Sequence, residues 1–248
     1  MNKIAILIIL GTSLSALVSP TDFLTEQKRY QRVRTSIADK EQLISEKLLK
    51  NGLALDNLNI LIIAYKEEDQ LELYAKKKDE LTYQKLITYD VCAKSGQAGP
   101  KRKQGDYQVP EGFYHVDRYN PASNFYLSLG INYPNLSDKR KSKADNLGGD
   151  IFIHGSCVTI GCLPMTTDKI KEIYLYAIHA RNNGQMKIPV YIFPFKMTNQ
   201  NFNTYKNRYS NNKELLDFWA NLKTGYDIFS REKKELKVTV EADGDYVF

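Results

Sequence analysis

The sequence contains few cysteines, no low-complexity segment and, beyond its N-terminus, no long hydrophobic run. Three Cys among 248 residues cannot build a small disulfide-rich scaffold. No stretch beyond the N-terminus approaches the roughly 18 consecutive apolar residues that a transmembrane helix requires. Hydrophobic residues make up 42% of the chain, including 17 Tyr and 10 Phe. This composition excludes a fully disordered chain and is typical of a folded protein.

The charge balance is moderately basic. Lys and Arg outnumber Asp and Glu by 35 to 29, which gives a formal net charge of +6 and a pI near 9.0. The basic residues are scattered, and no zinc-finger, RNP or helix-turn-helix signature accompanies them. We therefore expect no nucleic-acid partner. A surface of this charge is compatible with an anionic polymer such as a cell wall.

Residues 1–19 have the pattern of a secretory signal peptide. Lys3 precedes an apolar run over residues 4–10, and the small residues Ser13, Ser15 and Ala16 follow. We predict export, with membrane attachment only if this segment stays uncleaved. In an oxidising compartment structural cysteines tend to pair, and an odd number of them leaves at least one free thiol.

The remaining chain mixes helical and strand patterns. Apolar residues at helical spacing over 22–49, followed by Asn51 and Gly52, predict one or two amphipathic helices in an N-terminal segment (residues 20–57). The apolar run at 58–65 predicts a buried strand, the first of a mainly β domain with helices (α+β) over residues 58–248. Further strands are expected at 71–76, 83–92, 112–116, 125–131, 150–154 and 188–195, and helices at 166–183 and 214–222.

Two segments have the composition of exposed loops. Residues 98–106 are rich in Gly, Lys and Arg. Residues 137–145 contain four basic residues and almost no apolar ones, so we expect a solvated loop there. Residues 238–248 are expected to form an irregular tail of alternating polar and apolar residues.

The residues that carry chemistry lie between a predicted strand and a predicted helix. His154 ends the strand, and Cys162 follows eight residues later, shortly before the helix. A Cys at a helix N-terminus has its thiolate stabilised by backbone N–H groups and the helix dipole. A nearby His can act as its general base. We therefore predict a thiol nucleophile, Cys162, with His154 as its base.

This stretch resembles the L,D-transpeptidases with a YkuD-type catalytic domain, and within them the YafK-like subgroup. The resemblance rests on the pair His154 and Gly155 followed by Thr159, Gly161 and Cys162, and it extends over residues 58–248. It implies a YkuD-like β-sandwich catalytic domain preceded by the N-terminal helical segment. It also implies an exported enzyme of the bacterial periplasm or cell envelope that needs neither a metal nor another cofactor.

The resemblance implies acyl transfer on peptidoglycan stem peptides that contain diaminopimelate. Cys162 attacks the carbonyl at the L-centre and forms a thioester, while His154 serves as general base and acid. Backbone N–H groups around Gly161 and Cys162 are candidates for the oxyanion hole, and the Gly155 carbonyl is expected to orient His154.

Two positions depart from the wider family's pattern and bear on substrate binding. Ile160 stands where many members have His or Asn, and Pro164 stands where many have an Arg. A substrate carboxylate is therefore expected to meet Arg102 or Lys101 instead. Tyr133 is a further candidate for the substrate groove.

Cys157 has three interpretations. Its burial preference favours core packing. A disulfide with Cys162 would silence the nucleophile, and a zinc site with His154 and Cys162 would lack a clear fourth ligand.

Several functions remain open. The same thiol serves an L,D-transpeptidase, with a peptide or a wall-linked protein as amine, or an amide hydrolase that releases a D-amino acid or a wall-linked protein. A non-catalytic wall-binding module and a redox or metal protein are the alternatives from other classes.

Overall fold

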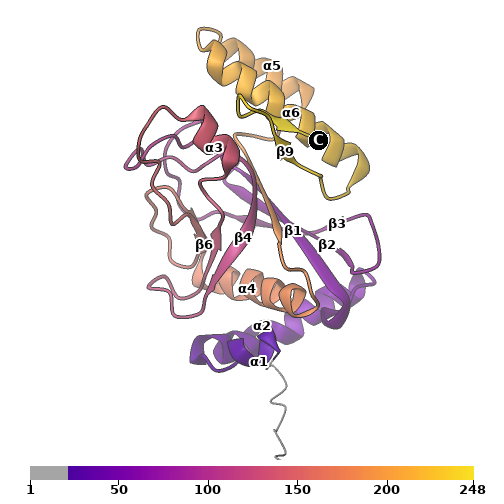
Figure 1. The fold of residues 1–248 in the computed structure, drawn as a ribbon. Coiled ribbons are helices and arrows are strands. Elements are labelled where there is room, and N and C mark those ends of the chain that lie inside the picture. Colours follow the sequence, from indigo (N-terminus) through magenta and orange to yellow (C-terminus); the bar gives the residue numbers. More distant parts are fainter. Residues whose placement is uncertain (1–21) are drawn as a thin grey trace, which may run out of the picture.

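A computed structural model describes residues 22–248, so the predicted signal peptide lies outside the described residues. Figure 1 shows the arrangement of the chain. In chain order the elements are α1 (Phe23–Gln27), α2 (Gln31–Lys50), the 3-10 turn η1 (Leu55–Asn57), β1 (Leu58–Tyr65), β2 (Gln70–Lys77), β3 (Gln84–Asp90), β4 (Gly112–Asn120), β5 (Ser128–Ile131), α3 (Leu136–Lys141), β6 (Phe152–His154), β7 (Leu163–Pro164), α4 (Thr167–Asn182), β8 (Pro189–Phe193), α5 (Asn199–Arg208), α6 (Lys213–Glu232), β9 (Thr239–Val240) and β10 (Tyr246–Val247).

Eight of these strands form one curled sheet with helices on both faces. The strand order is β3-β2-β1-β8-β4-β5-β6-β7, while β9 and β10 pair separately. Helices α4, α2 and α1 lie on one side of the sheet, and α5 and α6 lie on the other (Figure 1). The predicted α+β class is therefore confirmed.

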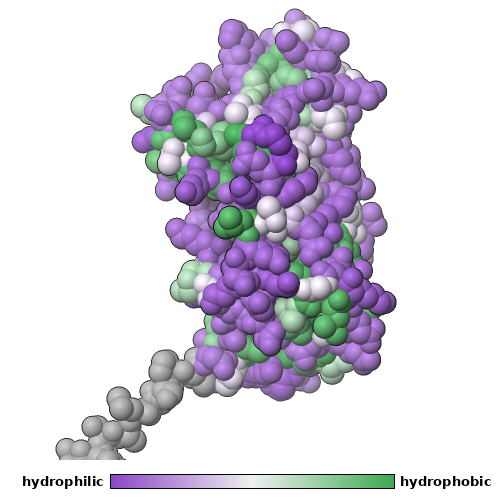
Figure 2. Space-filling model, turned by 90° about the vertical axis from the view of Figure 1, so that its right-hand side faces the viewer, coloured by the Kyte–Doolittle hydropathy of each residue, from purple (hydrophilic) through white to green (hydrophobic). Residues whose placement is uncertain are grey.

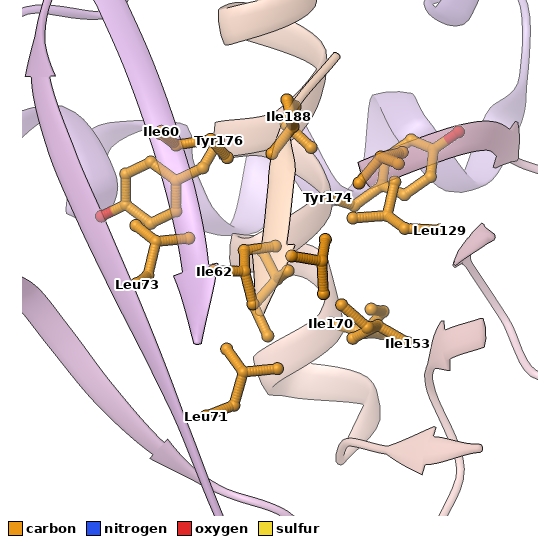
Figure 3. Close-up of a cluster of buried hydrophobic side chains, with 14 of the residues drawn as sticks. Ile60, Ile62, Leu71, Leu73, Leu129, Ile153, Ile170, Tyr174, Tyr176 and Ile188 are labelled. Carbon is orange, nitrogen blue, oxygen red and sulfur yellow. The ribbon is translucent and has the colours of Figure 1, made fainter. Parts of the chain in front are cut away.

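The side chains of the central strand β1 alternate between two hydrophobic cores, one on each face of the sheet. Successive side chains of a strand point to opposite faces. Residues 60, 62 and 64 enter the core on the α4 side, and residues 61, 63 and 65 enter the core that contains α6. Figure 3 shows Ile60 beside Tyr176 of α4, with Ile62 in the same cluster of buried side chains. Because both faces of β1 are buried, its sequence is a continuous apolar run.

The predicted N-terminal helices are confirmed. Asp22 caps α1 by accepting a hydrogen bond from the Thr25 backbone N–H, and α2 buries Val33, Ile44 and Leu48 against the sheet-covering helix α4. Asn51 is the C-cap of α2, at the predicted position.

The expectation of a solvated loop at residues 137–145 is wrong for residues 137–141. Residues 136–141 form helix α3, and Ser137 and Asp138 within it are buried. Asn135 caps the helix through a capping box with Asp138, and the Asp138 carboxylate accepts hydrogen bonds from Arg102 and Tyr114. Composition alone indicated solvation because these partners are far away in the sequence.

The C-terminal region also contains more structure than its sequence predicted. Helix α5 was not predicted, since its ten residues bury no side chain fully. Helix α6 extends ten residues beyond the predicted end at residue 222. The predicted irregular tail contains the two-stranded pair β9 and β10, in which Tyr246 is buried.

A buried ion pair joins the sheet to α6. Glu111 is fully buried, and its carboxylate accepts hydrogen bonds from Lys66 Nζ (2.9 Å), the Gly99 backbone N–H (2.8 Å) and Trp219 Nε1 (2.9 Å). Lys66 Nζ also donates to the carbonyl oxygens of Gly99 and Val109. This cluster fixes the Gly-rich loop between the end of β1 and helix α6.

The exposed surface is mostly polar. On the face shown in Figure 2, hydrophobic residues occur in small groups separated by hydrophilic ones. Among the helices of residues 22–248, none combines the length and hydrophobicity that crossing a membrane requires.

Replacing Glu111 tests how much the buried pair contributes to stability. Glu111→Ala leaves the Lys66 ammonium buried without a counter-charge, and the free energy of unfolding is expected to fall by about 3–5 kcal/mol. Urea denaturation of the oxidised protein measures this change. Glu214→Ala, at an exposed position on α6, is the matched control and is expected to stay within about 0.5 kcal/mol of the wild type. A loss below about 1 kcal/mol for Glu111→Ala contradicts the assignment.

Candidate active site

Strands β6 and β7 bring His154 and Cys162 to one edge of the sheet. The two strands are parallel, with Ile153 opposite Leu163 and His154 opposite Pro164. Extending this register by one residue places Cys162 beside Phe152. Because residues two apart on a strand share a face, Cys162 and His154 lie on the same face of this strand pair.

Cys162 has a free and protonated thiol. Its Sγ donates to the carbonyl oxygen of Asp150 at 3.6 Å. Burial raises the pKa of the thiol, and the Asp150 carboxylate adds to this, whereas a hydrogen bond from the Phe152 backbone and the charge of Lys101 act in the opposite direction. The resting thiol therefore needs a base.

His154 is held as a neutral base. Only 2% of its surface is exposed, and its Nδ1 lies 2.6 Å from the carbonyl oxygen of Gly155. A carbonyl only accepts, so Nδ1 carries the proton and Nε2 is left as the acceptor. Burial lowers the pKa of His154, and the hydrogen bond to Gly155 only partly offsets this. Within residues 22–248 no hydrogen bond joins the two side chains, since the Cys162 thiol donates to the Asp150 carbonyl.

Cys157 forms a disulfide with Cys92, which overturns all three interpretations of this residue. The two Cα atoms are 5.4 Å apart, and Cys157 is exposed rather than in the core. A disulfide between Cys157 and Cys162 and a zinc site on His154, Cys157 and Cys162 are both wrong, because the Cys157 sulfur is already bonded. The disulfide ties the segment before Cys162 to the end of β3.

The turn before Cys162 is organised by Thr159. Its Oγ1 accepts hydrogen bonds from the backbone N–H groups of Gly161 (3.2 Å) and Cys162 (2.8 Å) and donates to the Cys162 carbonyl (2.9 Å). The two predicted oxyanion donors are therefore occupied by Thr159 in this structure. Gly161 has φ +133°, and a Cβ there would lie 3.0 Å from the Gln108 carbonyl oxygen, so both backbone conformation and space favour glycine.

Cys162 lies between β6 and α4, as expected, but it is not in the first turn of the helix. Strand β7 follows Cys162 directly, and α4 begins only at Thr167, where Thr166 is the N-cap residue. The groups that favour the thiolate are a hydrogen bond from the Phe152 backbone and the charge of Lys101, and the burial that raises the pKa of Cys162 outweighs both.

The three predicted substrate-binding residues lie in one network of polar and aromatic contacts. Lys101 is buried and pairs with Asp106 at 2.7 Å. Its ammonium lies 5.9 Å from the ring centroid of Tyr133, whose hydroxyl donates to the Leu147 carbonyl. Lys101 and Tyr133 are thus committed to contacts within the protein.

Arg102 is more accessible than these two residues. It pairs with Asp138 at 3.1 Å and lies over the Phe218 ring, with 26% of its side chain exposed. It lines a cleft of about 470 Å³ whose wall also carries Arg140, Lys141 and Lys143.

Two contacts of the site were not predicted. Phe125 lies over His154 with ring centroids 4.5 Å apart. Lys66 lines a narrow pocket together with Cys162. Neither residue belongs to a recognisable motif, and both reach the site only through the folding of distant segments.

Comparison with known proteins identifies related chains. The family model described as the L,D-transpeptidase catalytic domain, YkuD, matches residues 59–192. YafK of Escherichia coli strain K12, provisionally named an L,D-transpeptidase, is 42% identical over 190 residues, which cover 76% of this chain and 73% of YafK. YafK of Escherichia coli O157:H7 matches with the same identity and coverage.

Two solved structures are also similar. The helical cell shape determining protein Pgp2 from Campylobacter jejuni has 22% sequence identity and a TM-score of 0.44, and the match covers 74% of each chain. Bd1075 of Bdellovibrio bacteriovorus has 26% identity and a TM-score of 0.40, with 55% of this chain and 48% of that chain covered.

The protonation states of the site predict the pH dependence of alkylation by iodoacetamide. Since burial raises the pKa of Cys162, the thiolate is expected to form only above the ordinary thiol value of about 8.5. The alkylation rate should therefore rise about tenfold per pH unit from pH 6 to pH 8. Mass spectrometry of the labelled protein measures it, and Cys162→Ala should take up no label. A rate already maximal at pH 6 would show a preformed thiolate–imidazolium pair and contradict the neutral pair.

Proposed function

Because the chain belongs to the family of L,D-transpeptidase catalytic domains, we propose that it is an exported cysteine enzyme that remodels peptidoglycan. Residues 1–19 direct export to the periplasm or cell envelope, and residues 58–248 form the catalytic domain after the helical segment 20–57. The substrates are stem peptides that contain diaminopimelate. The chemistry needs no metal or other cofactor and no nucleic acid.

One observation supports this proposal most strongly. The imidazole of His154 donates through Nδ1 to the Gly155 carbonyl, which leaves Nε2 as a proton acceptor on the same strand pair as the free thiol of Cys162. A nucleophile, a base and a group that orients the base are the three components of a covalent acyl-transfer site. A binding module has no need of this arrangement.

In the first step Cys162 attacks the amide carbonyl at the L-centre of the diamino acid. The thiol proton moves to His154 Nε2, and the new S–C bond gives a tetrahedral oxyanion. The C–N bond then breaks, His154 returns the proton to the leaving amine, and a thioester remains on Cys162.

The oxyanion takes over hydrogen-bond donors that Thr159 holds in the resting site. The N–H groups of Gly161 and Cys162 both point at Thr159 Oγ1. When the substrate carbonyl gains negative charge it is the better acceptor, because charge-assisted hydrogen bonds are roughly twice as strong as neutral ones. Thr159 thus keeps both donors oriented before the reaction.

The second step decides between transfer and hydrolysis. An amine of another peptide, or of a wall-linked protein, attacks the thioester, its proton passes to the Cys162 sulfur through His154, and the S–C bond breaks. Water in place of the amine gives a carboxylate and makes the enzyme an amide hydrolase. The same residues carry both outcomes, so the acceptor decides which one occurs.

Arg102 is the proposed contact for a substrate carboxylate. It is more exposed than Lys101, and it lines a basic cleft. A guanidinium binds a carboxylate through two parallel hydrogen bonds. Lys101 acts at longer range by favouring the Cys162 thiolate, and Tyr133 supports the ammonium of Lys101.

Mass spectrometry of wall fragments tests the proposed activity. The oxidised protein and Cys162→Ala are incubated with defined tetrapeptide muropeptides and with protein-linked wall fragments. Cross-linked dimers from the wild type alone establish transfer, and cleaved products without dimers establish hydrolysis. Cys162→Ala is expected to be at least about 1,000-fold slower, because it lacks the nucleophile.

A matched control separates the nucleophile from the other two cysteines. The double variant Cys92→Ser/Cys157→Ser retains Cys162 as its single thiol and is expected to retain measurable activity. If neither product forms with the wild type while the protein still binds the wall, the chain is a binding module and the proposal fails.

Replacing Arg102 tests its proposed contact with the substrate. Arg102→Ala is expected to raise KM for a stem peptide with a free carboxylate about tenfold and to leave kcat within about twofold, since the contact is made in the ground state as well as the transition state. Arg29→Ala removes the same charge from an exposed site in the N-terminal segment and serves as control. Steady-state kinetics with an unchanged KM for Arg102→Ala would reject the role of Arg102.

A further inference from the structure

We propose that the N-terminal helix α2 is part of the catalytic apparatus. In this proposal Arg32 of α2 fixes the loop of residues 121–127, and the loop holds Phe125 against the imidazole of His154. Arg32 and Phe125 are thus positioning residues that act through His154. The inference rests on the proposed catalytic role of His154. Arg32 lies outside residues 59–192, which the family model matches.

Arg32 connects α2 to the loop through two backbone acceptors. Its Nη1 donates to the carbonyl oxygens of Ser123 and Tyr126, the latter at 2.8 Å. Its guanidinium carbon also lies 5.5 Å from the centroid of the Tyr126 ring. These contacts span more than 90 residues of sequence and enclose Phe125 between the two acceptors.

The loop needs such an anchor because its backbone is strained. Tyr126 has φ +74°, in the left-handed region that a bulky residue rarely adopts. Strained residues of this kind persist only where surrounding contacts impose them. Besides Arg32, the ammonium of Lys171 lies 5.4 Å from the Tyr126 ring centroid, so α2 and α4 both hold this residue.

The loop in turn packs directly on the catalytic strand. The Gly155 backbone N–H donates to the Leu127 carbonyl at 3.1 Å. A Cβ on Gly155 would lie 2.5 Å from the Phe125 carbonyl oxygen, so only glycine permits this approach. The Phe125 ring covers His154 at 4.5 Å with an interplanar angle of 31°. The imidazole is therefore oriented by Gly155 at Nδ1 and by Phe125 on its face.

Charged contacts hold helix α2 on α4. Its Lys40 pairs with Asp168 of α4 at 2.7 Å, and its Asp39 pairs with Lys171 at 2.6 Å. Its Glu41 lies 3.1 Å from His179. The buried side chains of α2 complete the packing on α4.

Releasing the loop has two chemical consequences for His154. The Phe125 ring no longer shields the imidazole from solvent, so the burial that lowers the pKa of His154 decreases. It also loses its fixed orientation, so Nε2 is aimed less well at the thiol. The charged groups held against the loop are Arg32 and Lys171, and the titratable group on the neighbouring strand pair is Cys162.

The experiment compares Arg32→Ala with Arg34→Ala in the full, oxidised protein. Arg34 is a close match, because it lies on the same helix and its Nη1 also donates to two carbonyls, those of Lys28 and Arg29, which are not in the loop. The chain has three His, so proton NMR resolves the His154 titration, and His154→Gln assigns it.

Arg32→Ala is expected to move the His154 titration midpoint upward by about 0.5 pH unit and to lower kcat about tenfold with KM within about twofold. Phe125→Ala is expected to do the same, and the double variant is expected to add little, because both residues act through one loop. Arg32→Lys should recover part of kcat, since an ammonium still reaches a carbonyl.

The proposal is overturned if the His154 titration midpoint is the same in Arg32→Ala and Arg34→Ala. Fully additive effects of Arg32→Ala and Phe125→Ala on kcat overturn it as well, because additivity would show that the two residues act independently of each other. The titration needs no substrate, so a protein without any activity on the wall would defeat the proposed function and leave this test readable. Thermal unfolding of each variant identifies a general loss of structure, which would lower stability without a selective change at His154.

Discussion

The buried pair of Lys66 and Glu111 is the interaction on which the placement of the site depends. Burying two opposite charges is energetically acceptable only when the remaining polar atoms of both groups are hydrogen-bonded. Here the Gly99 N–H and Trp219 Nε1 donate to the Glu111 carboxylate. The segments that supply these groups must therefore meet at one point. They are the end of β1, the Gly-rich loop, the start of β4 and helix α6. The same loop carries Lys101, and Gln108, two residues after the loop, lies against Gly161 in the turn before Cys162, so the ion pair sets one wall of the site.

Burial sets the protonation states of Cys162 and His154. It raises the pKa of the Cys162 thiol and lowers the pKa of the His154 imidazole, so both shifts favour neutral groups. A neutral pair is less open to chance oxidation than a preformed thiolate, because the thiolate is the reactive form. In this structure the thiol donates to the carbonyl oxygen of Asp150 and not to His154.

The sequence predicted those features whose cause is local. The apolar run of residues 58–65 is a strand because both of its faces are buried, and His154 ends a strand as its sequence pattern predicted, whereas strand β7 directly after Cys162 was not predicted. Features caused by distant partners were missed. Helix α3 depends on contacts of Asp138 with Arg102 and Tyr114, and the disulfide joins cysteines 65 residues apart. Nothing within either segment indicates these contacts.

The strands next to His154 and Cys162 are short, and this explains why contacts from distant segments matter to the site. Strands β6 and β7 contribute three and two residues, against eight in β1. So few ladder hydrogen bonds hold the edge of the sheet only weakly. Its geometry must be completed from outside the sheet, by the disulfide on one side and by α2 through the loop of residues 121–127 on the other. The positions of His154 and Cys162 therefore depend on contacts from segments that are far away in the sequence.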